Sequence, residues 1–386
     1  MVGERVIYLD FAAATPLDER VFDVMKPYLT TEFYNPSASY QAARRVRADY
    51  EVARHRLAMA VGAKQHEIIL TAGSTESINL GVHGVIGHYG GRVAVSGIEH
   101  VAVLAAGKRH DVDMIVADSR GYITPEAVAR VITPKTTLIS VGYVNNELGT
   151  VQPLRDIAAV VEGERQQRLS AGNLHPIFLH TDASQAVGLL DISVSRLGVD
   201  LMTIGAGKCY GPKQVGLLWV RAGLELQPLV DGGGQENNVR SGTENVAGVI
   251  GFAEAVSLAV ATRKSESYRL SQLRDQLWSR LDGAVPDIVR NGHAKRHAPH
   301  ILHVSVPGLD GERVVFALDE RGVMAATGSA CAASSGTRSH VLTAVGMSDE
   351  LADGSLRLSV GRTTTTTDID VAAQIIADVI TRERGQ

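Results

Sequence analysis

Residues 137–182, TLISVGYVNNELGTVQPLRDIAAVVEGERQQRLSAGNLHPIFLHTD, contain two apolar runs on either side of an amphipathic segment. The runs at 137–144 and 176–182 are almost continuously hydrophobic, as expected for strands that are covered on both faces. Residues 153–169 have the spacing of an amphipathic helix. A strand, a helix and a second strand in this order predict a parallel pair within an α/β layered domain.

The same alternation of strand and helix extends outward on both sides of this stretch. A further helix is expected at 124–132, and long helices at 37–63 and 243–281. Together with the first two, five more apolar runs predict a mainly parallel, seven-stranded sheet; the additional strands are expected at 67–70, 92–96, 114–117, 201–205 and 215–220.

A second, smaller α+β unit is predicted after the long helix, from segments at 300–308, 311–323, 355–362 and 369–380. We therefore expect a large domain over 15–258 and a small domain formed by 1–14 and 259–386. The threonine run at 363–370 is interpreted as a helix start, capped by a Thr-x-x-Asp box that ends at Asp370.

Composition excludes several classes of function. The 386 residues include 38 Lys and Arg against 42 Asp and Glu, a formal net charge of −4, so direct nucleic-acid binding is not expected. No apolar run approaches the about 20 residues of a membrane span, and the N-terminus lacks the pattern of a secretory signal. Two cysteines without a CxxC pair favour a reducing, cytoplasmic location.

Two motifs follow predicted strands and suggest a ligand site. The Gly-Ser-Thr turn in TAGSTESINL (71–80) opens a helix and is suited to a phosphate, although Ser74 or Thr75 could equally be an ordinary helix cap. Asp182 in HTDASQAVG (180–188) ends an apolar strand, where parallel sheets bind ligands. Its carboxylate could hold a protonated ring nitrogen or could cap a helix.

Two further motifs carry candidate nucleophiles. In TIGAGKCYGPKQVG (203–216), Lys208 is surrounded by small residues, which favours a cofactor lysine over a surface turn lysine. In GSACAASS (328–335), Cys331 lies among Gly, Ala and Ser, a composition typical of an exposed loop and of a thiol that moves. Cys209 is interpreted as inert packing.

With these motifs the sequence resembles the class V aminotransferase-like, pyridoxal-phosphate (PLP) enzymes, and most of all the cysteine desulfurases of the NifS/IscS type. The likeness covers essentially the whole chain and includes YLDFAAATP, GSTESINL, IEHVAVL, VNNELGTVQP, TDASQAVG, GKCYGPKQVG, GGGQENNVRSGTEN, GSACAASS and LRLSVGR. It implies the PLP-dependent transferase fold type I and an L-cysteine desulfurase, which converts L-cysteine to L-alanine and transfers the sulfur to an acceptor protein.

The resemblance also implies roles for individual residues toward PLP. Lys208 would bind the cofactor covalently and later move protons, Asp182 would face the pyridinium nitrogen, and His100 would stack on the ring and take part in catalysis. Asn146 and Gln185 would hold the ring edge near the phenolic oxygen. The phosphate would be held by Ser74, Thr75 and a partner subunit's counterpart of Thr243.

For the substrate, the resemblance implies that Arg357 and Asn35 hold the carboxylate of L-cysteine and that Cys331 accepts the sulfur as a persulfide. No metal is implied, and Thr243 suggests a homodimer. The sulfur acceptor stays open, because iron–sulfur cluster assembly, tRNA thiolation and DNA phosphorothioation all use such enzymes.

Three positions depart from the family pattern. Gly205 and Gly207 stand where a serine and a histidine usually help to anchor the phosphate, and Gln235 stands where histidine is common. The two glycines are expected to weaken cofactor retention unless water or another side chain substitutes. They leave open a non-catalytic regulatory partner with a degraded PLP site. An enzymatic alternative that keeps PLP also stays open, namely a selenocysteine or cystine lyase or an aminotransferase, and the catalytic thiol of Cys331 would discriminate against it.

Overall fold

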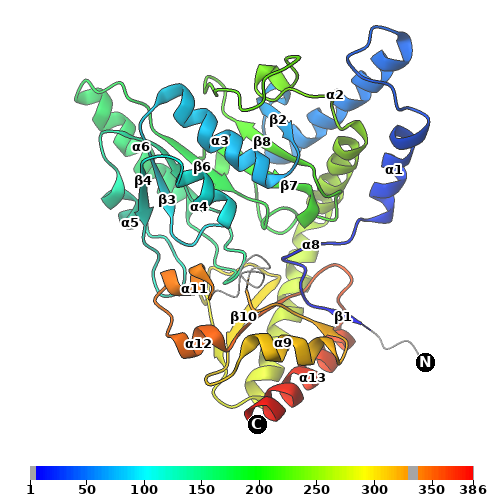
Figure 1. Cartoon of the computed structure of the whole chain (residues 1–386), viewed down its shortest axis with the longest axis vertical. Helices are drawn as coiled ribbons and strands as arrows, with labels where there is room; N and C mark the ends of the chain where they lie inside the picture. Colours follow the sequence, from blue (N-terminus) through cyan, green and yellow to red (C-terminus); the bar gives the residue numbers. More distant parts are fainter. Residues whose placement is uncertain (1–5, 329–337, 386) are drawn as a thin grey trace.

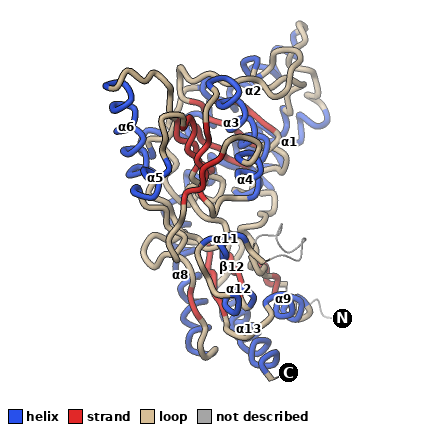
Figure 2. The backbone as a smooth tube through the Cα atoms, turned by 60° about the vertical axis from the view of Figure 1, so that its left-hand side comes forward, coloured by secondary structure: helices blue, strands red, loops and turns tan. Residues whose placement is uncertain are grey.

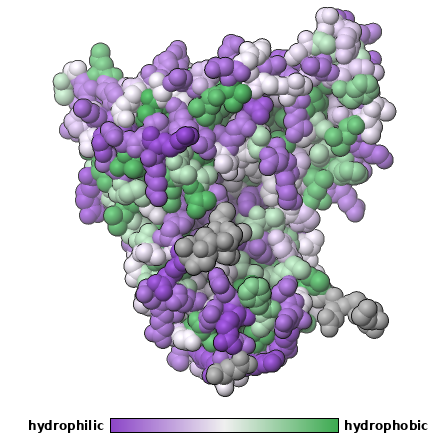
Figure 3. All heavy atoms as spheres, in the orientation of Figure 1, coloured by the Kyte–Doolittle hydropathy of each residue, from purple (hydrophilic) through white to green (hydrophobic). Residues whose placement is uncertain are grey.

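The computed structural model describes residues 6–328 and 338–385. Figure 1 shows an upper body that contains the large sheet and a lower body that contains a smaller sheet, with the long helix α8 (Val246–Ala284) passing from one to the other. The N-terminal strand and the C-terminal helix both belong to the lower body. On the face in Figure 3, hydrophilic and hydrophobic residues are intermixed.

The large sheet has seven strands, and its order is β2-β8-β7-β6-β5-β3-β4. Strand β8 is antiparallel to both of its neighbours, and the other neighbouring pairs are parallel. The mainly parallel α/β fold predicted from the sequence is therefore confirmed. The strands are β2 (Ile68–Thr71), β3 (Arg92–Ser96), β4 (Val112–Ile115), β5 (Thr136–Ser140), β6 (Phe178–Asp182), β7 (Leu201–Gly205) and β8 (Gly216–Val220).

Helices cover both faces of this sheet (Figure 2). Alternate strand residues enter two different hydrophobic clusters: Leu138 and Leu201 pack with α3 and α4, whereas Ile139 and Met202 pack with helices on the opposite face. The helices of this body are α1 (Glu19–Thr30), α2 (Gln41–Val61), α3 (Ser74–Tyr89), α4 (Val101–Gly107), α5 (Pro125–Val131), α6 (Leu154–Ser170) and α7 (Val194–Leu197), with short 3-10 turns η1 (Gln65–Glu67), η2 (Ala206–Lys208) and η3 (Glu236–Asn238).

The lower body contains a small three-stranded sheet and a separate pair of short strands. Strand β10 pairs antiparallel with β9 and β12, and β1 pairs parallel with β11. Its elements are β1 (Ile7–Tyr8), β9 (Val289–Arg290), β10 (Ile301–Ser305), α9 (Gly311–Asp319), β11 (Val323–Met324), α11 (His340–Ala344), α12 (Asp349–Asp353), β12 (Ser355–Ser359) and α13 (Thr366–Arg384).

Helix α8 joins the two cores. Buried residues from Val246 to Ala259 pack in the large-body cluster, and those from Leu270 to Leu281 pack in the lower one. The predicted domain boundary at 258 lies near this change and stays a prediction. By length and composition α8 could cross a membrane, but 56% of its most apolar window is buried inside the protein, as in the core helix of a globular fold.

Two local predictions were wrong in detail. The strand expected at 137–144 ends at Ser140, because the chain then leaves the sheet and Gly142 contributes to the wall of a cavity. The capping box at the start of α13 consists of Thr365 and Asp368, whose backbone N–H and side chain bond reciprocally. Asp370 accepts from Arg280 instead, one turn away from the cap.

Candidate active site

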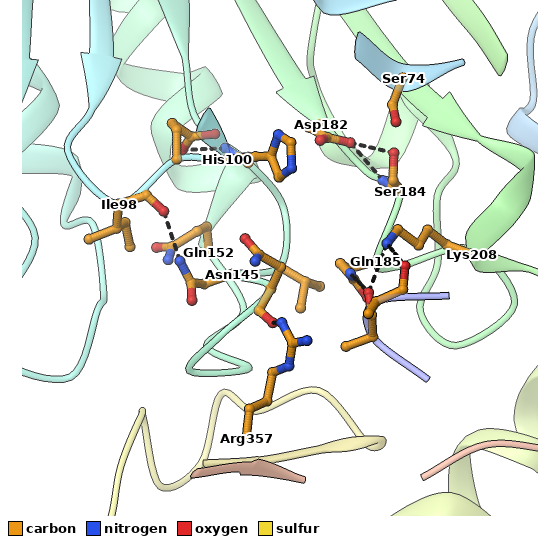
Figure 4. A pocket seen from close by; sticks show the side chains of 16 residues that line it. Ser74, Ile98, His100, Asn145, Gln152, Asp182, Ser184, Gln185, Lys208 and Arg357 are labelled. Atoms are coloured by element: carbon orange, nitrogen blue, oxygen red, sulfur yellow. Dashed lines mark hydrogen bonds between the residues drawn. The ribbon is translucent and has the colours of Figure 1, made fainter. Parts of the chain in front are cut away.

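A cavity of about 200 Å³ lies at the carboxyl ends of β5, β6 and β7. An apolar cavity of about 150 Å³ holds benzene, so this one has room for a substituted aromatic ring. Both bodies contribute to its wall (Figure 4). The lining residues are Ala12, Ala13, Ser74, Ile98, Glu99, His100, Gly142, Val144, Asn145, Asn146, Gln152, Asp182, Ser184, Gln185, Lys208 and Arg357.

Asp182 is the last residue of β6, so its side chain lies where the parallel strands end. The same carboxylate oxygen accepts from the Ser184 backbone N–H at 2.9 Å and from the Ser184 hydroxyl at 2.6 Å. Ser184 Oγ in turn accepts from the Gly205 N–H at 3.2 Å. The carboxylate is therefore held in one orientation by groups that only donate to it, which suits a fixed negative charge.

Lys208 ends the 3-10 turn η2 that follows β7. Its Nζ donates to the Ala12 carbonyl at 2.9 Å and also to the Ala13 carbonyl, so the N-terminal segment forms part of the site. Close backbone packing explains one of the small residues of this stretch, Gly211. A Cβ at Gly211 would lie 2.9 Å from the Ala206 carbonyl oxygen, where no side chain fits.

His100 is the N-cap of α4, and its Nδ1 accepts the Ala102 N–H at 3.1 Å. Burial, the largest cause, lowers the pKa of this imidazole. A neutral ring with Nδ1 as acceptor carries its proton on Nε2. His100 therefore offers the cavity an aromatic ring with one N–H donor.

Ser74 is the first residue of α3, and the N-cap before it is Gly73, which has no side chain to accept from the first amides. These N–H groups and the Ser74 hydroxyl form a site suited to an anion. A Cβ at Gly205 would lie only 2.9 Å from Ser74 Oγ. The Ser74 hydroxyl thus occupies the space that a side chain at 205 would need. A Cβ at Gly207 would meet only Lys213 Cγ, at 3.6 Å.

Arg357 lies on β12 of the lower body and is 1% exposed. Its Nη2 donates to Asp10 at 2.7 Å, and its Nη1 donates to the Asn146 carbonyl at 3.1 Å. The Nε of Arg357 is buried, and no hydrogen-bond partner for it exists within residues 6–328 and 338–385. A substrate carboxylate would therefore share this guanidinium with Asp10.

Gln185 lies between the two bodies. Its amide nitrogen donates to the Ala12 carbonyl at 2.8 Å, and its amide oxygen lies 3.2 Å from His300 Nε2. Figure 4 shows Lys208 and Gln185 side by side, with Arg357 approaching from the lower body and His100 and Asp182 on the far side.

The structure thus brings together seven of the residues singled out in the sequence, namely Ser74, His100, Asn146, Asp182, Gln185, Lys208 and Arg357. Thr75 and Thr243 are exposed, and neither they nor Asn35 line the cavity of this single chain. Their roles stay predictions, and Cys331 lies outside the described residues. Cys209 is buried, and burial raises the pKa of its thiol to about 12, which agrees with a packing role.

Sequence reasoning missed several polar residues of the site. Ser184 orients Asp182, Asp10 pairs with Arg357, and Asn145 holds its own turn by accepting from the N–H groups of Glu147 and Leu148. Glu99 also lines the cavity and accepts from the Gly142 N–H at 2.8 Å. Burial, the largest cause, raises the pKa of Glu99 to about 8, so its carboxyl is protonated at neutral pH.

A lysine and an aspartate at the strand ends, an aromatic ring beside them and an anion site at a helix N-terminus define an α/β enzyme class that holds a phosphorylated aromatic cofactor. The family model for class-V aminotransferases matches residues 7–371. The chain belongs to this family, as its motifs predicted, and the family is PLP-dependent.

Individual relatives agree with this assignment. The chain is 38% identical over 389 residues to a cysteine desulfurase IscS of Dictyoglomus turgidum, covering 99% of this chain and 96% of the relative. A solved NifS-like protein superposes with a TM-score of 0.88 at 29% identity, covering 98% and 100% of the two chains. The solved complex of SspA with cysteine has a TM-score of 0.79 at 33% identity, covering 92% and 98%.

Proposed function

We propose that the protein is a PLP-dependent L-cysteine desulfurase, which forms L-alanine and carries the sulfur as a persulfide on Cys331 to an acceptor protein. The observation that carries the proposal is the convergence of Lys208, Asp182, His100 and Arg357 on one cavity at the strand ends. Relatives named cysteine desulfurase along the full length of the chain and a structural neighbour solved with cysteine support the choice of substrate.

The residues of the cavity fit PLP group by group. Lys208 Nζ is suited to bind the aldehyde, and the Asp182 carboxylate is suited to bind the ring nitrogen. The backbone amides at the start of α3, together with Ser74, are suited to bind the phosphate. When bound, PLP supplies an electron sink that makes bonds at the substrate Cα and Cβ labile.

The side chains of this protein would then act on the substrate. Arg357 would bind the carboxylate of L-cysteine, and Lys208 Nζ would take the proton from Cα. In the overall exchange the carbon–sulfur bond of L-cysteine breaks, a carbon–hydrogen bond forms in L-alanine, and a sulfur–sulfur bond forms at Cys331. One S–H bond breaks as well: of the two thiol protons, one ends on Cβ of L-alanine and the other stays on the persulfide, so atoms and electrons balance without an external oxidant.

The test is an assay of the purified protein with L-cysteine, PLP and a thiol reductant. We expect L-alanine and sulfide in equal amounts and, without reductant, one added sulfur atom on the peptide that contains Cys331. Cys209→Ala is the matched control, because that buried thiol is expected to carry no persulfide and the variant should keep turning over. Sulfide release by Cys331→Ala at the wild-type rate would instead support a lyase.

The Ser74 hydroxyl is expected to replace the side chain that Gly205 lacks. Gly205→Ser should weaken PLP binding about tenfold, because its Cβ displaces Ser74 Oγ and a hydrogen bond to a charged group contributes about 1.5 kcal/mol. Ser74→Ala should lose a similar amount, and the double variant should recover most of it. Equilibrium dialysis of PLP measures the effect. Gly207→Ser is the control, and unchanged binding by Gly205→Ser would contradict the idea.

The remaining parts of the proposal concern partners. We propose a homodimer in which Thr243 serves the partner's site, which agrees with its exposure in the single chain. The acceptor would be a scaffold, tRNA-thiolation or DNA-modification protein, and the location cytoplasmic. A degraded, non-catalytic site is disfavoured, because the cavity retains its lysine, aspartate, histidine and arginine.

A further inference from the structure

His300 lies immediately before β10 in the lower body and is 5% exposed. Its Nε2 is 3.2 Å from the amide oxygen of Gln185, which follows β6 in the large body. This contact joins a histidine that does not line the main cavity to a residue that does. His300 is therefore placed to act on the site through Gln185.

The direction of this hydrogen bond is set by the chemistry of its neighbours. A backbone carbonyl only accepts, so the group that faces Ala12 O must be the amide nitrogen of Gln185. The amide oxygen then faces His300, whose Nε2 must carry a proton and donate. The assignment follows from the partners alone and needs no choice between amide orientations.

The imidazole of His300 stays neutral. Burial, the largest cause, lowers its pKa to about 3, and the charged or titratable groups near it, His297, Arg274, Arg357 and Lys208, act in the same direction. With the proton on Nε2, the other nitrogen is an acceptor. That Nδ1 is buried, and the described part of the chain supplies no hydrogen-bond partner for it.

A second, small cavity lies beside Lys208 and His300. It measures about 40 Å³, and its wall includes His300, Thr262, Glu266 and Arg362. A cavity of this size has room for about one water molecule. Nδ1 itself has almost no accessible surface, so the hydrogen bond from Nε2 to Gln185 is the contact of this ring that sets its tautomer within the described residues.

We propose that His300 is a positioning residue, which keeps the amide nitrogen of Gln185 turned toward the cofactor site so that its second N–H donates to the phenolic oxygen of PLP. The inference rests on the proposed function for the presence of PLP. Loss of His300 would leave the Gln185 oxygen buried without a donor, and the side chain would no longer be held from both ends.

The experiment compares the PLP-loaded wild type with three His300 variants. His300→Phe removes both nitrogens, and His300→Asn places an amide near Nδ1, too short to reach Gln185. His300→Gln places an amide nitrogen near Nε2 and can restore the donor. His175→Phe is the matched control, because His175 bonds Thr137 at the amino end of β5, far from the cavity.

The measured quantity is the midpoint of the pH titration of the visible absorption of bound PLP. A donor to the phenolic oxygen stabilises its negative charge, so the nitrogen bonded to the cofactor loses its proton at a lower pH. We therefore expect His300→Phe and His300→Asn to raise the midpoint by about one unit. His300→Gln and His175→Phe should titrate as the wild type does.

The inference would be overturned if both His300→Phe and His300→Asn kept the wild-type midpoint. Loss of a purely structural histidine would lower the unfolding temperature and leave the midpoint unchanged. A wild type that takes up PLP while the variants titrate unchanged would leave the proposed function intact. A wild type that takes up no PLP would overturn the proposed function and the inference with it.

Discussion

Lys208→Ala is expected to reduce alanine formation from L-cysteine at least about a thousandfold. In the proposed function the lysine supplies both the covalent link to the cofactor and the base at the substrate Cα, and each of these roles is usually worth a factor of a hundred or more. Its Nζ lies in the main cavity, held by the carbonyls of Ala12 and Ala13. Alanine at this position offers no nitrogen for either step.

Single-turnover and steady-state assays with added PLP measure the loss, and the absorption spectrum reports the covalent link separately. Lys213→Ala is the matched control in the same loop, because Lys213 is exposed and its Nζ donates to the Thr15 carbonyl at 3.4 Å without lining the main cavity. We expect it to keep most of the activity. If Lys208→Ala turned over at more than a tenth of the wild-type rate, the lysine could not be the base.

Much of the large body could be predicted from the sequence because its strands are buried on both faces. Each gives a short apolar run, and the runs alternate with amphipathic helices, which fixes the layered architecture. The positions of Asp182 and Lys208 followed from the same reasoning, since Asp182 ends one such run and Lys208 lies in the short turn after another. The predicted strand boundaries were wrong where the chain leaves the sheet to form the site, as it does after Ser140.

The polar contacts that complete the site could not be predicted, because they join segments far apart in the chain. Asp10 and Arg357 are 347 residues apart, and Gln185 and His300 are 115 apart. Arg357 lies within a strand and His300 lies just before one, and in neither case does the local sequence indicate the partner residue. These pairs depend on how the lower body docks against the large sheet.

The two glycines before Lys208 are a second example of contacts that the sequence alone could not predict. In the sequence, Gly205 and Gly207 look like two equal losses of phosphate ligands. In the structure they differ, because the space beside Gly205 is filled by the Ser74 hydroxyl while the space beside Gly207 is open. Only the approach of α3 to the end of β7 distinguishes the two positions, because it brings the Ser74 hydroxyl beside Gly205, whereas the side chain nearest to Gly207 is that of Lys213.

Asp182→Asn is expected to lower turnover by about a hundredfold to a thousandfold with little change in folding. The amide oxygen of asparagine can still accept from the Ser184 N–H and hydroxyl, so the hydrogen bonds that fix the side chain remain. What is lost is the negative charge that, in the proposed function, keeps the ring nitrogen of the cofactor protonated. A preorganised charge of this kind in a buried site commonly accounts for such a factor.

Ser184→Ala tests the orientation of the Asp182 carboxylate separately from its charge. It removes the 2.6 Å hydrogen bond to Asp182 but leaves the carboxylate charged, and a hydrogen bond of this kind contributes about 1.5 kcal/mol, so a loss of about tenfold is expected. Turnover of L-cysteine, thermal unfolding and PLP affinity are compared across the wild type and the two variants. If Asp182→Asn lost no more activity than Ser184→Ala, the carboxylate would serve only to place Ser184 and the Gly205 turn. A much larger loss in Asp182→Asn, with similar unfolding temperatures in both variants, assigns the effect to the charge, because the two side chains share the same hydrogen-bond network.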